Sequence, residues 1–365
     1  MKDHGGNIYA HFRNGFSTGA IIDFSASINP LGMPRTAEAA IRKHMRLVPH
    51  YPEPYAETLS AAIAKHFRLC FSSVLCGNGS TELIYLIPKV LNPKRVLVTA
   101  PAFSEYEKAS RMNGAAMRYY RLRPEDDFCV DPVRFIEAMQ GRRRGSLKTT
   151  GAGAACDMAF LCNPNNPTGK LLRKRDVLKI ADAARELRCL LVVDEAFIDF
   201  CPNESVLSSV AKNPYLIVIR SMTKFYALAG LRLGFGVFPS AIASKIKSYK
   251  EPWSVNSLAA AAGRAVISDD AYRDASHAMI RREKRYLEKC LDNLPIPYVA
   301  SDSNYYLLYM KKARLIVRTL EKKGLLLRDC SNFKWLGPGY VRIAVRARKE
   351  NSLLMHELGK IHRQS

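Results

Sequence analysis

The sequence predicts an α/β fold: a large domain with helices flanking a mostly parallel sheet, followed by a smaller α+β domain. Four short apolar runs support the sheet, at Arg95–Ala100, Met158–Cys162, Cys189–Val193 and Tyr215–Ile219. Continuous apolar runs of this length are typical of strands buried on both faces of a parallel sheet. Helical patterns lie between the runs, for example at Leu171–Leu187. This alternation of strands and helices favours a layered α/β domain.

The chain has 365 residues, which is long enough for more than one domain. Its last part shows long helical patterns and then strand patterns at Tyr305–Met310 and Tyr340–Val345. We therefore expect a large domain over residues 41–255 and a small C-terminal domain over residues 256–365. Residues 1–40 are expected to pack with the small domain and to cover the cleft.

The composition is that of an ordinary globular protein, with 48% hydrophobic and 24% charged residues. No apolar segment is long enough to span a bilayer, and the first residues lack the apolar stretch of a signal peptide. The nine cysteines form no C-x-x-C pair, and several lie inside apolar runs. We therefore expect reduced thiols in a cytoplasmic protein, with no metal site and no membrane partner.

The formal net charge is +23. A charge of this size is compatible with a nucleic-acid partner, an anionic small-molecule substrate or a solvated basic surface. The basic residues are spread along the chain, and no zinc-finger or aromatic-and-basic single-strand motif is present. We interpret most of the charge as solvated surface, with a share at a phosphate site.

Polar residues directly follow the apolar runs, where ligands bind in sheets of this kind. Asp194 follows one run, so we expect it to be buried, and a buried carboxylate needs a partner such as a protonated ring nitrogen. Lys224 follows another run, and a desolvated lysine more readily becomes the neutral amine that forms a Schiff base. The alternative to a ligand-binding role is a helix cap or a salt bridge for Asp194. For Lys224 it is a basic turn with a structural role.

A phosphate site is predicted where a glycine-rich turn opens a helix. Free amides at a helix N-terminus bind phosphate. Gly79 lets an anion approach, while Ser80 and Thr81 add hydroxyl groups. Ser221 and Arg232 flank the lysine with a further hydroxyl and a guanidinium. The alternative for the first group is an ordinary helix cap.

Two further residues follow strand ends. Asn163–Gly169 contains three asparagines and two prolines, which favour a rigid turn that can direct the amide of Asn166. Phe103 follows a strand-end Pro-Ala, where an aromatic ring can stack on a planar ligand. A plain turn and a core aromatic residue are the alternatives.

Together these motifs resemble the fold-type I pyridoxal 5′-phosphate (PLP) enzymes of the aspartate aminotransferase superfamily, over nearly the whole chain. Asp194 lies 28 residues after Asn166 and 30 before Lys224, a spacing similar to that of the superfamily. The resemblance implies a PLP Schiff base on Lys224, with Asp194 on the pyridine nitrogen and Asn166 on the phenolic oxygen. It also implies that Phe103 stacks on the ring. The phosphate would be held by Gly79, Ser80, Thr81, Ser221 and Arg232.

The resemblance also implies a homodimer with shared active sites. Tyr51, in the run His-Tyr-Pro-Glu-Pro, matches a residue that reaches the cofactor phosphate of the neighbouring subunit. One residue departs from the common pattern: Phe197 stands where many relatives have a tyrosine that bonds the phenolic oxygen. The protonation of the cofactor imine is therefore left open.

Within the superfamily, the sequence is most similar to the threonine-phosphate decarboxylases of cobalamin biosynthesis. The similarity lies in His4–Asn7, Asp23–Gly32, the unsubstituted Asp194–Phe200 run and Pro252–Asn256. It implies that substrate is bound by Arg342 (carboxylate), Arg328 (phosphate), and His4, Gly5, Gly6 and Asn29 around the phosphate.

The expected reaction is decarboxylation of L-threonine O-3-phosphate to (R)-1-aminopropan-2-yl phosphate and CO₂, or of L-serine O-phosphate to ethanolamine phosphate. These substrates differ by one methyl group, worth only about 1–3 kcal/mol in an apolar pocket. A histidinol-phosphate aminotransferase is the alternative enzyme. A PLP-fold regulator that binds nucleic acid is an alternative of another class, but no obvious helix-turn-helix pattern supports it.

Overall fold

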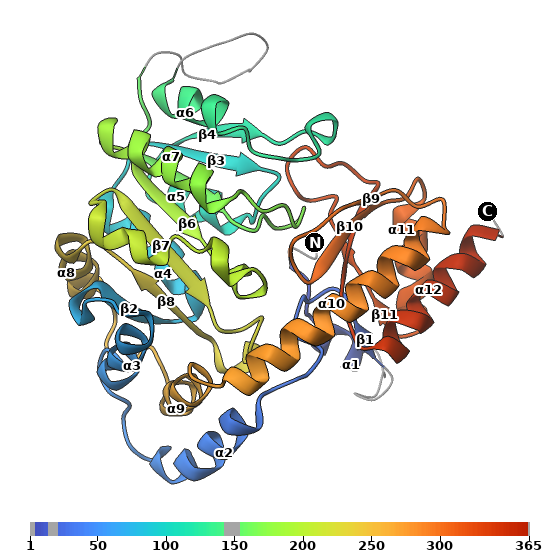
Figure 1. The fold of residues 1–365 in the computed structure, drawn as a ribbon, viewed down its shortest axis with the longest axis horizontal. Helices are drawn as coiled ribbons and strands as arrows, with labels where there is room; N and C mark the ends of the chain where they lie inside the picture. The colour runs from blue at the N-terminus through green and yellow to red at the C-terminus, as the bar shows by residue number, and fades with distance from the viewer. Residues whose placement is uncertain (1–3, 14–20, 142–153, 364–365) are drawn as a thin grey trace.

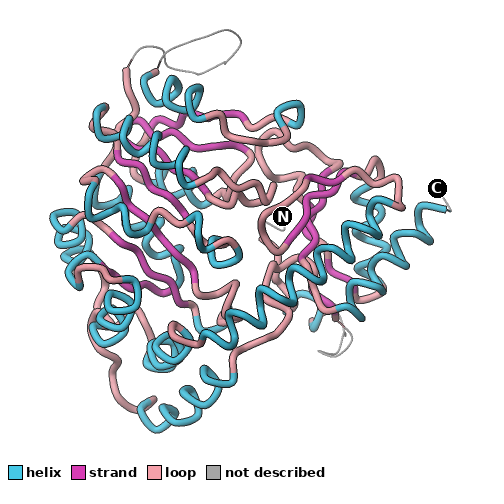
Figure 2. Tube along the Cα trace, in the orientation of Figure 1, coloured by secondary structure: helices cyan, strands magenta, loops and turns pink. Residues whose placement is uncertain are grey.

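The computed structural model describes residues 4–13, 21–141 and 154–363. It contains two groups of strands, each with helices around it (Figure 2). The larger group is a seven-stranded sheet, and the smaller group belongs to a second part of the chain. The long helix α10 (Asp270–Asp292) runs from the side of α9 (Ser257–Val266) to the short strands of the second part (Figure 1). The predicted α/β architecture with a smaller α+β part is confirmed.

Neighbouring strands of the seven-stranded sheet are parallel, except that β8 runs antiparallel to β2 and β7. All four predicted apolar runs form adjacent parallel strands, with ends shifted by at most two residues. Three further strands, β2, β4 and β8, complete the sheet. The order is β2 (Val74–Asn78), β8 (Leu233–Val237), β7 (Leu216–Ser221), β6 (Leu190–Asp194), β5 (Met158–Cys162), β3 (Arg95–Ala100) and β4 (Ala116–Arg121).

Helices cover both faces of this sheet, which explains why its strands are apolar without alternation. Side chains alternate between the faces along a strand. On β3, Val96 and Val98 join one buried cluster, and Leu97 joins the other. One cluster includes α4 (Gly79–Leu91), α5 (Glu105–Met112) and α8 (Ser240–Tyr249); the other includes α3 (Glu57–Phe67), α6 (Pro132–Gln140), α7 (Lys174–Glu186) and α9.

The second part is an antiparallel sheet with its own buried cluster. The two predicted strands are present as β10 (Tyr305–Tyr309) and β13 (Tyr340–Ala344). They pair with each other at the centre of the order β12-β13-β10-β9. Apolar side chains of the helices pack on this sheet. The remaining elements are β9 (Tyr298–Val299), β12 (Arg328–Asp329), α11 (Ala313–Lys322) and α12 (Arg348–Arg363).

The N-terminal residues contact both parts. The short strand β1 (Ile22–Asp23) pairs in parallel with β11 (Leu325–Leu326), and α1 (Tyr9–Phe12) precedes it. The helix α2 (Arg35–His44) packs against α9, which also contacts α3 and β8. The three predicted domain ranges stay a prediction. Among the described residues, no helix has the length and apolar character needed to cross a membrane.

Candidate active site

The carboxyl ends of three adjacent parallel strands bring the predicted residues together. Strand β6 ends at Asp194, which is paired in register with Cys162 at the end of β5. Asn166 lies in the turn after β5. Strand β7 ends at Ser221, three residues before Lys224. Because these strands are neighbours in one sheet, their following turns lie at the same edge.

Lys224 lies in a setting that favours its neutral form. Burial, together with the nearby cations Arg232 and Arg342, lowers the pKa of its amine to about 8, whereas Asp194 opposes the shift. Nζ donates a 2.6 Å hydrogen bond to Oγ1 of Thr223. A lysine with this pKa is partly neutral near neutral pH, so it can act as a nucleophile or a proton carrier.

Asp194 is buried and hydrogen-bonded on both carboxylate oxygens. The hydroxyl of Tyr106 donates to Oδ2 at 2.6 Å, and the backbone N–H of Ala196 donates to Oδ1 at 3.0 Å. Burial raises the pKa of Asp194, whereas these two bonds and the charge of Lys224 oppose the rise. The carboxylate is therefore placed to accept one more hydrogen-bond donor from a ligand above the strand ends.

The predicted phosphate residues meet at the N-terminus of α4. Gly79 has φ +73° and donates its N–H to the carbonyl oxygen of Arg232 at 2.8 Å. A Cβ at this position would lie 2.6 Å from Nη2 of Arg232, so only glycine allows this close approach. Ser80 and Thr81 occupy the same first helical turn. The hydroxyl of Ser221 is 2.6 Å from Oγ1 of Thr223.

The two arginines predicted to bind substrate face each other in the second sheet. Arg342 on β13 is paired in register with Arg328 on β12. Arg342 donates from Nη1 to Oδ1 of Asn166 and from Nη2 to the carbonyl oxygen of Ser25, the latter at 2.9 Å. Its Nε is buried and has no hydrogen-bond acceptor among the described residues. Its guanidinium carbon lies 5.0 Å from the ring centre of Tyr305.

Arg328 is buried and is held by its neighbours. Nη2 donates to Oδ1 of Asn332 at 2.8 Å, and Nη1 donates to the carbonyl oxygen of Asp329. A cavity of about 90 Å³ is lined by Arg328 together with His4 and Phe103. The structure therefore brings the arginine predicted for phosphate next to the aromatic residue predicted for the cofactor ring.

Of the residues near the N-terminus, His4 lines this cavity, and Gly5 and Gly6 pack on Ser25. Nε2 of His4 lies 3.0 Å from Oε1 of Glu105, and the His4 ring centre is 5.6 Å from that of Phe103. The N–H of Gly6 donates to Oγ of Ser25 at 2.8 Å. A Cβ on Gly5 would lie 2.2 Å from the carbonyl oxygen of Ser25, so glycine permits this packing.

The side chains of two further predicted residues contact neighbouring segments of the chain. The side chain of Asn29 donates to the carbonyl oxygen of Phe225 and to Oγ of Ser276, at 2.8 and 2.7 Å. It thereby joins the N-terminal segment to the turn after Lys224 and to α10. Tyr51 is 84% exposed, and its ring packs on Trp253 with ring centres 5.2 Å apart.

Two residues that hydrogen-bond to the predicted site residues were not predicted from the sequence. Tyr106 bonds to Asp194, and Thr223 bonds to Lys224 and Ser221. Thr223 lies inside the Ser-x-Thr-Lys motif, so its spacing carried a signal. Tyr106 lies three residues after Phe103, but only the order of β3 and β5–β6 in the sheet brings it to Asp194.

Comparisons with known proteins identify the family of the chain. A family model described as aminotransferase class I and II matches residues 20–361. The threonine-phosphate decarboxylase of Salmonella typhimurium is 36% identical, covering 98% of this chain and 96% of the relative. A histidinol-phosphate aminotransferase of Oleidesulfovibrio alaskensis is 32% identical, covering 94% and 88%.

Solved structures show the same fold. The histidinol-phosphate aminotransferase from Clostridium acetobutylicum matches with a TM-score of 0.85 and 26% identity, covering 94% of this chain and 100% of that one. The L-threonine-O-3-phosphate decarboxylase from Porphyromonas gingivalis matches with a TM-score of 0.80 and 26% identity, covering 93% and 99%. The chain therefore belongs to the aminotransferase class I and II family.

Proposed function

We propose that this chain is a PLP-dependent carboxy-lyase that decarboxylates an O-phosphorylated hydroxy amino acid, with L-threonine O-3-phosphate favoured. The main support for a substrate with two anionic groups is the pairing of Arg328 with Arg342 across β12 and β13. A substrate with a carboxylate and a phosphate needs a cation for each, because an unpaired anion is costly to desolvate. Decarboxylation is further supported by the Salmonella typhimurium relative, which has higher identity and coverage than the aminotransferase from Oleidesulfovibrio alaskensis.

The described residues fit PLP at the ends of β5–β7. Gly79 lets the guanidinium of Arg232 lie against the N-terminus of α4, and a helix N-terminus beside an arginine favours an anion. When bound, PLP supplies an electron sink that stabilises negative charge on the substrate Cα. We propose that Lys224 would form the covalent bond to PLP, that Asp194 would bind its pyridine nitrogen and that Asn166 would bind its phenolic oxygen. Phe103 would stack on the face of the ring. The cofactor phosphate would be held by Gly79, Ser80, Thr81, Ser221 and Arg232.

In this proposal, Lys224 is the proton carrier of the reaction. Its pKa of about 8 allows its amine to accept and return a proton near neutral pH. The hydroxyl of Thr223 holds Nζ at 2.6 Å. After CO₂ leaves, Lys224 returns a proton to the substrate Cα. Tyr106 helps to keep Asp194 ionised, so that the carboxylate can hold a protonated ring nitrogen.

Arg342 and Arg328 orient the substrate. Arg342 binds the carboxylate, and the angle at which it holds this group decides whether the bond to CO₂ or the bond to hydrogen breaks. Arg328 binds the substrate phosphate with His4, while Gly5 and Gly6 allow the N-terminal residues to pack closely over it. Asn29 acts by joining these residues to the turn after Lys224.

We also propose a cytoplasmic homodimer in which Tyr51 reaches the cofactor phosphate of the second copy. This is supported by the exposure of Tyr51 and of other large apolar side chains near it in sequence or in contact with it. Large exposed apolar groups that lie together mark interaction sites. All nine cysteines are free thiols, in agreement with a reducing compartment. The exposed apolar residues are Met45, Leu47, Val48, Tyr51 and Trp253.

One experiment tests the reaction directly. The purified enzyme is incubated with threonine phosphate, serine phosphate and histidinol phosphate, each with and without 2-oxoglutarate, and the products are identified. Release of CO₂ from a phosphorylated hydroxy amino acid without the keto acid supports the proposal. Formation of glutamate from 2-oxoglutarate with histidinol phosphate would replace it with the aminotransferase, an alternative supported by the Clostridium acetobutylicum structure.

A further inference from the structure

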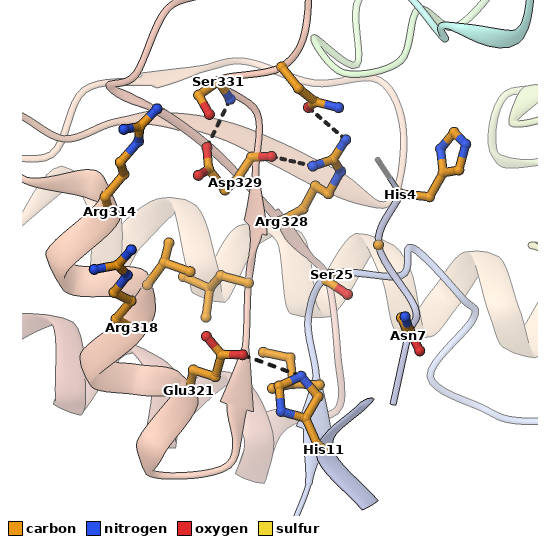
Figure 3. Close-up of a pocket in the computed structure, with 15 residues that line it drawn as sticks. His4, Asn7, His11, Ser25, Arg314, Arg318, Glu321, Arg328, Asp329 and Ser331 are labelled. Atoms are coloured by element: carbon orange, nitrogen blue, oxygen red, sulfur yellow. Dashed lines mark hydrogen bonds and ion pairs between the residues drawn. The ribbon is translucent and has the colours of Figure 1, made fainter. Parts of the chain in front are cut away.

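A second and larger cavity also borders Arg328, and its lining does not include Phe103. It has a volume of about 370 Å³ and lies between the N-terminal residues and α11 (Figure 3). This volume is within the range of about 300–1,000 Å³ that is usual for small-molecule pockets. The cavity shares His4, Arg328 and Asn332 with the 90 Å³ cavity described above. The two cavities are therefore adjacent.

Two arginines on α11 line this larger cavity. Arg314 and Arg318 are four residues apart, so they lie on the same face of the helix, and like charges at this spacing destabilise a helix. Neither arginine has an acidic ion-pair partner among the described residues. Several other helical arginines pair with a carboxylate three or four residues away, among them Arg42 with Glu38, Arg111 with Glu107, Arg185 with Asp182, and Arg273 with Asp270.

The remaining charged groups of the cavity do not neutralise the two arginines. Glu321, three residues after Arg318, makes no ion pair with that arginine, and its Oε1 lies 3.5 Å from Nε2 of His11. Asp329 accepts a hydrogen bond of 2.8 Å from the backbone N–H of Ser331. Figure 3 shows Arg314 and Arg318 extending from α11 along one side of the cavity, with Arg328 beyond Asp329. Among the described residues that line the cavity, three carry a guanidinium group and two a carboxylate.

We infer that this cavity is an outer anion subsite, which binds the phosphate group of a small phosphate monoester next to Arg328. The inference rests on the proposed function for the identity of the monoester, the phosphorylated amino acid. Guanidinium groups suit phosphate because they donate two parallel hydrogen bonds to its oxygens. A bound phosphate also removes the repulsion between Arg314 and Arg318. The subsite concentrates the anionic substrate beside Arg328. From this subsite the substrate enters the smaller cavity.

The test measures binding of inorganic phosphate to the PLP-loaded enzyme by isothermal titration calorimetry at low ionic strength. The double variant Arg314→Ala/Arg318→Ala is compared with Lys349→Ala. Lys349 is an exposed cation on α12, does not line the cavity and has no ion pair among the described residues. We expect the double variant to bind phosphate about tenfold more weakly, and Lys349→Ala to bind it as the unmodified enzyme does.

A second measurement is the salt dependence of kcat/KM for the phosphorylated amino acid. Loss of the outer subsite lowers kcat/KM at low ionic strength and reduces its decline with added salt. Unchanged phosphate affinity in the double variant would overturn the subsite, as would an equal loss in Lys349→Ala. If CO₂ is released but the double variant binds phosphate normally, the subsite is wrong and the proposed function stands. If no phosphorylated amino acid is decarboxylated but phosphate binding still depends on the two arginines, the function is wrong and the subsite stands.

Discussion

The hydroxyl of Tyr106 donates a 2.6 Å hydrogen bond to Oδ2 of Asp194, the buried carboxylate at the end of β6. The ring of Tyr106 is held by stacking on Phe160, with ring centres 5.1 Å apart and an angle of 13° between the planes. Burial raises the pKa of Asp194, and the Tyr106 hydrogen bond lowers it. Tyr106 is therefore a positioning residue, which stabilises the ionised form of Asp194.

Replacing Tyr106 with phenylalanine removes only this hydroxyl. A hydrogen bond to a charged group contributes about 1.5–3 kcal/mol, so the pKa of Asp194 rises and the carboxylate holds a protonated ring nitrogen less well. We expect kcat to fall about tenfold or more. We also expect the pH dependence of the cofactor absorbance to change, which a purely structural role does not produce.

The matched control for this variant is Tyr298→Phe. The hydroxyl of Tyr298 also bonds to an aspartate, Asp292, at 2.8 Å, but on the surface of the second part. Its loss should leave both kcat and the absorbance profile unchanged. Identical pH profiles for Tyr106→Phe and the unmodified enzyme would contradict the role given to Tyr106.

Much of this arrangement could be predicted because each motif directly follows an apolar run. Asp194 and the turn containing Asn166 lie at strand ends in any parallel sheet built from those runs. Strand β8 did not stand out, because Gly234 and Gly236 interrupt its apolar pattern, and the glycines are needed for close packing on Ser80 and Phe238. The position of Tyr106 depends on contacts across 88 residues, which local patterns do not contain.

The local sequence pattern does not determine the roles of Asn29 and Tyr51. Asn29 resembles a ligand-binding residue in its motif, but its side chain bonds to Phe225 and Ser276. Only the folded structure shows that these groups lie within reach. Tyr51 lies on the surface of its own chain, and the role proposed for it depends on a second copy.

A methyl group at Gly79 should weaken cofactor binding. The new Cβ would lie 2.6 Å from Nη2 of Arg232, and φ at this position is +73°. Gly79→Ala therefore displaces the guanidinium and also adds about 1–2 kcal/mol of backbone strain. We expect faster loss of PLP during dialysis, measured from the cofactor absorbance.

Gly114→Ala separates these two effects. Gly114 has φ +75°, but a Cβ there meets no atom within 4 Å. This control should lower the melting temperature through the same backbone strain while leaving PLP retention unchanged. Equal PLP loss in both variants would mean that strain alone, and not the contact with Arg232, weakens the site.

Lys224 is expected to carry the cofactor and to react in its neutral form. Because the pKa of its amine is lowered to about 8, the neutral fraction increases as the pH rises through that value. The rate at which PLP is incorporated into cofactor-free enzyme should therefore rise with pH, reach half its maximum near pH 8 and level off at higher pH. After borohydride reduction, peptide mapping should place the label on Lys224, and Lys224→Ala should abolish turnover. A label on another lysine would refute the assignment.

Arg328 is expected to be needed for the phosphate of the substrate and not for the cofactor. Leaving a buried phosphate without its cation costs about 2–5 kcal/mol. Arg328→Ala should therefore lower kcat/KM for the phosphorylated amino acid strongly while leaving the cofactor absorbance intact. The ratio of kcat/KM for threonine phosphate to that for plain threonine is the deciding quantity. If this ratio were the same in Arg328→Ala and the unmodified enzyme, another group would have to bind the phosphate.

Mixing two inactive variants tests the shared active site. In a dimer of one Lys224→Ala subunit and one subunit with a disabling Tyr51 substitution, one site receives both defects. The other site has an intact Lys224 and receives the intact Tyr51 of its partner. In a random equal mixture, about half of the dimers are hybrids, so about a quarter of all sites recover. Turnover should therefore return to about a quarter of the activity of the unmodified enzyme once subunits have exchanged. If Tyr51 served its own subunit, every site would keep one defect and mixing would restore nothing. The same would hold for a monomer, so the recovered fraction decides between the arrangements.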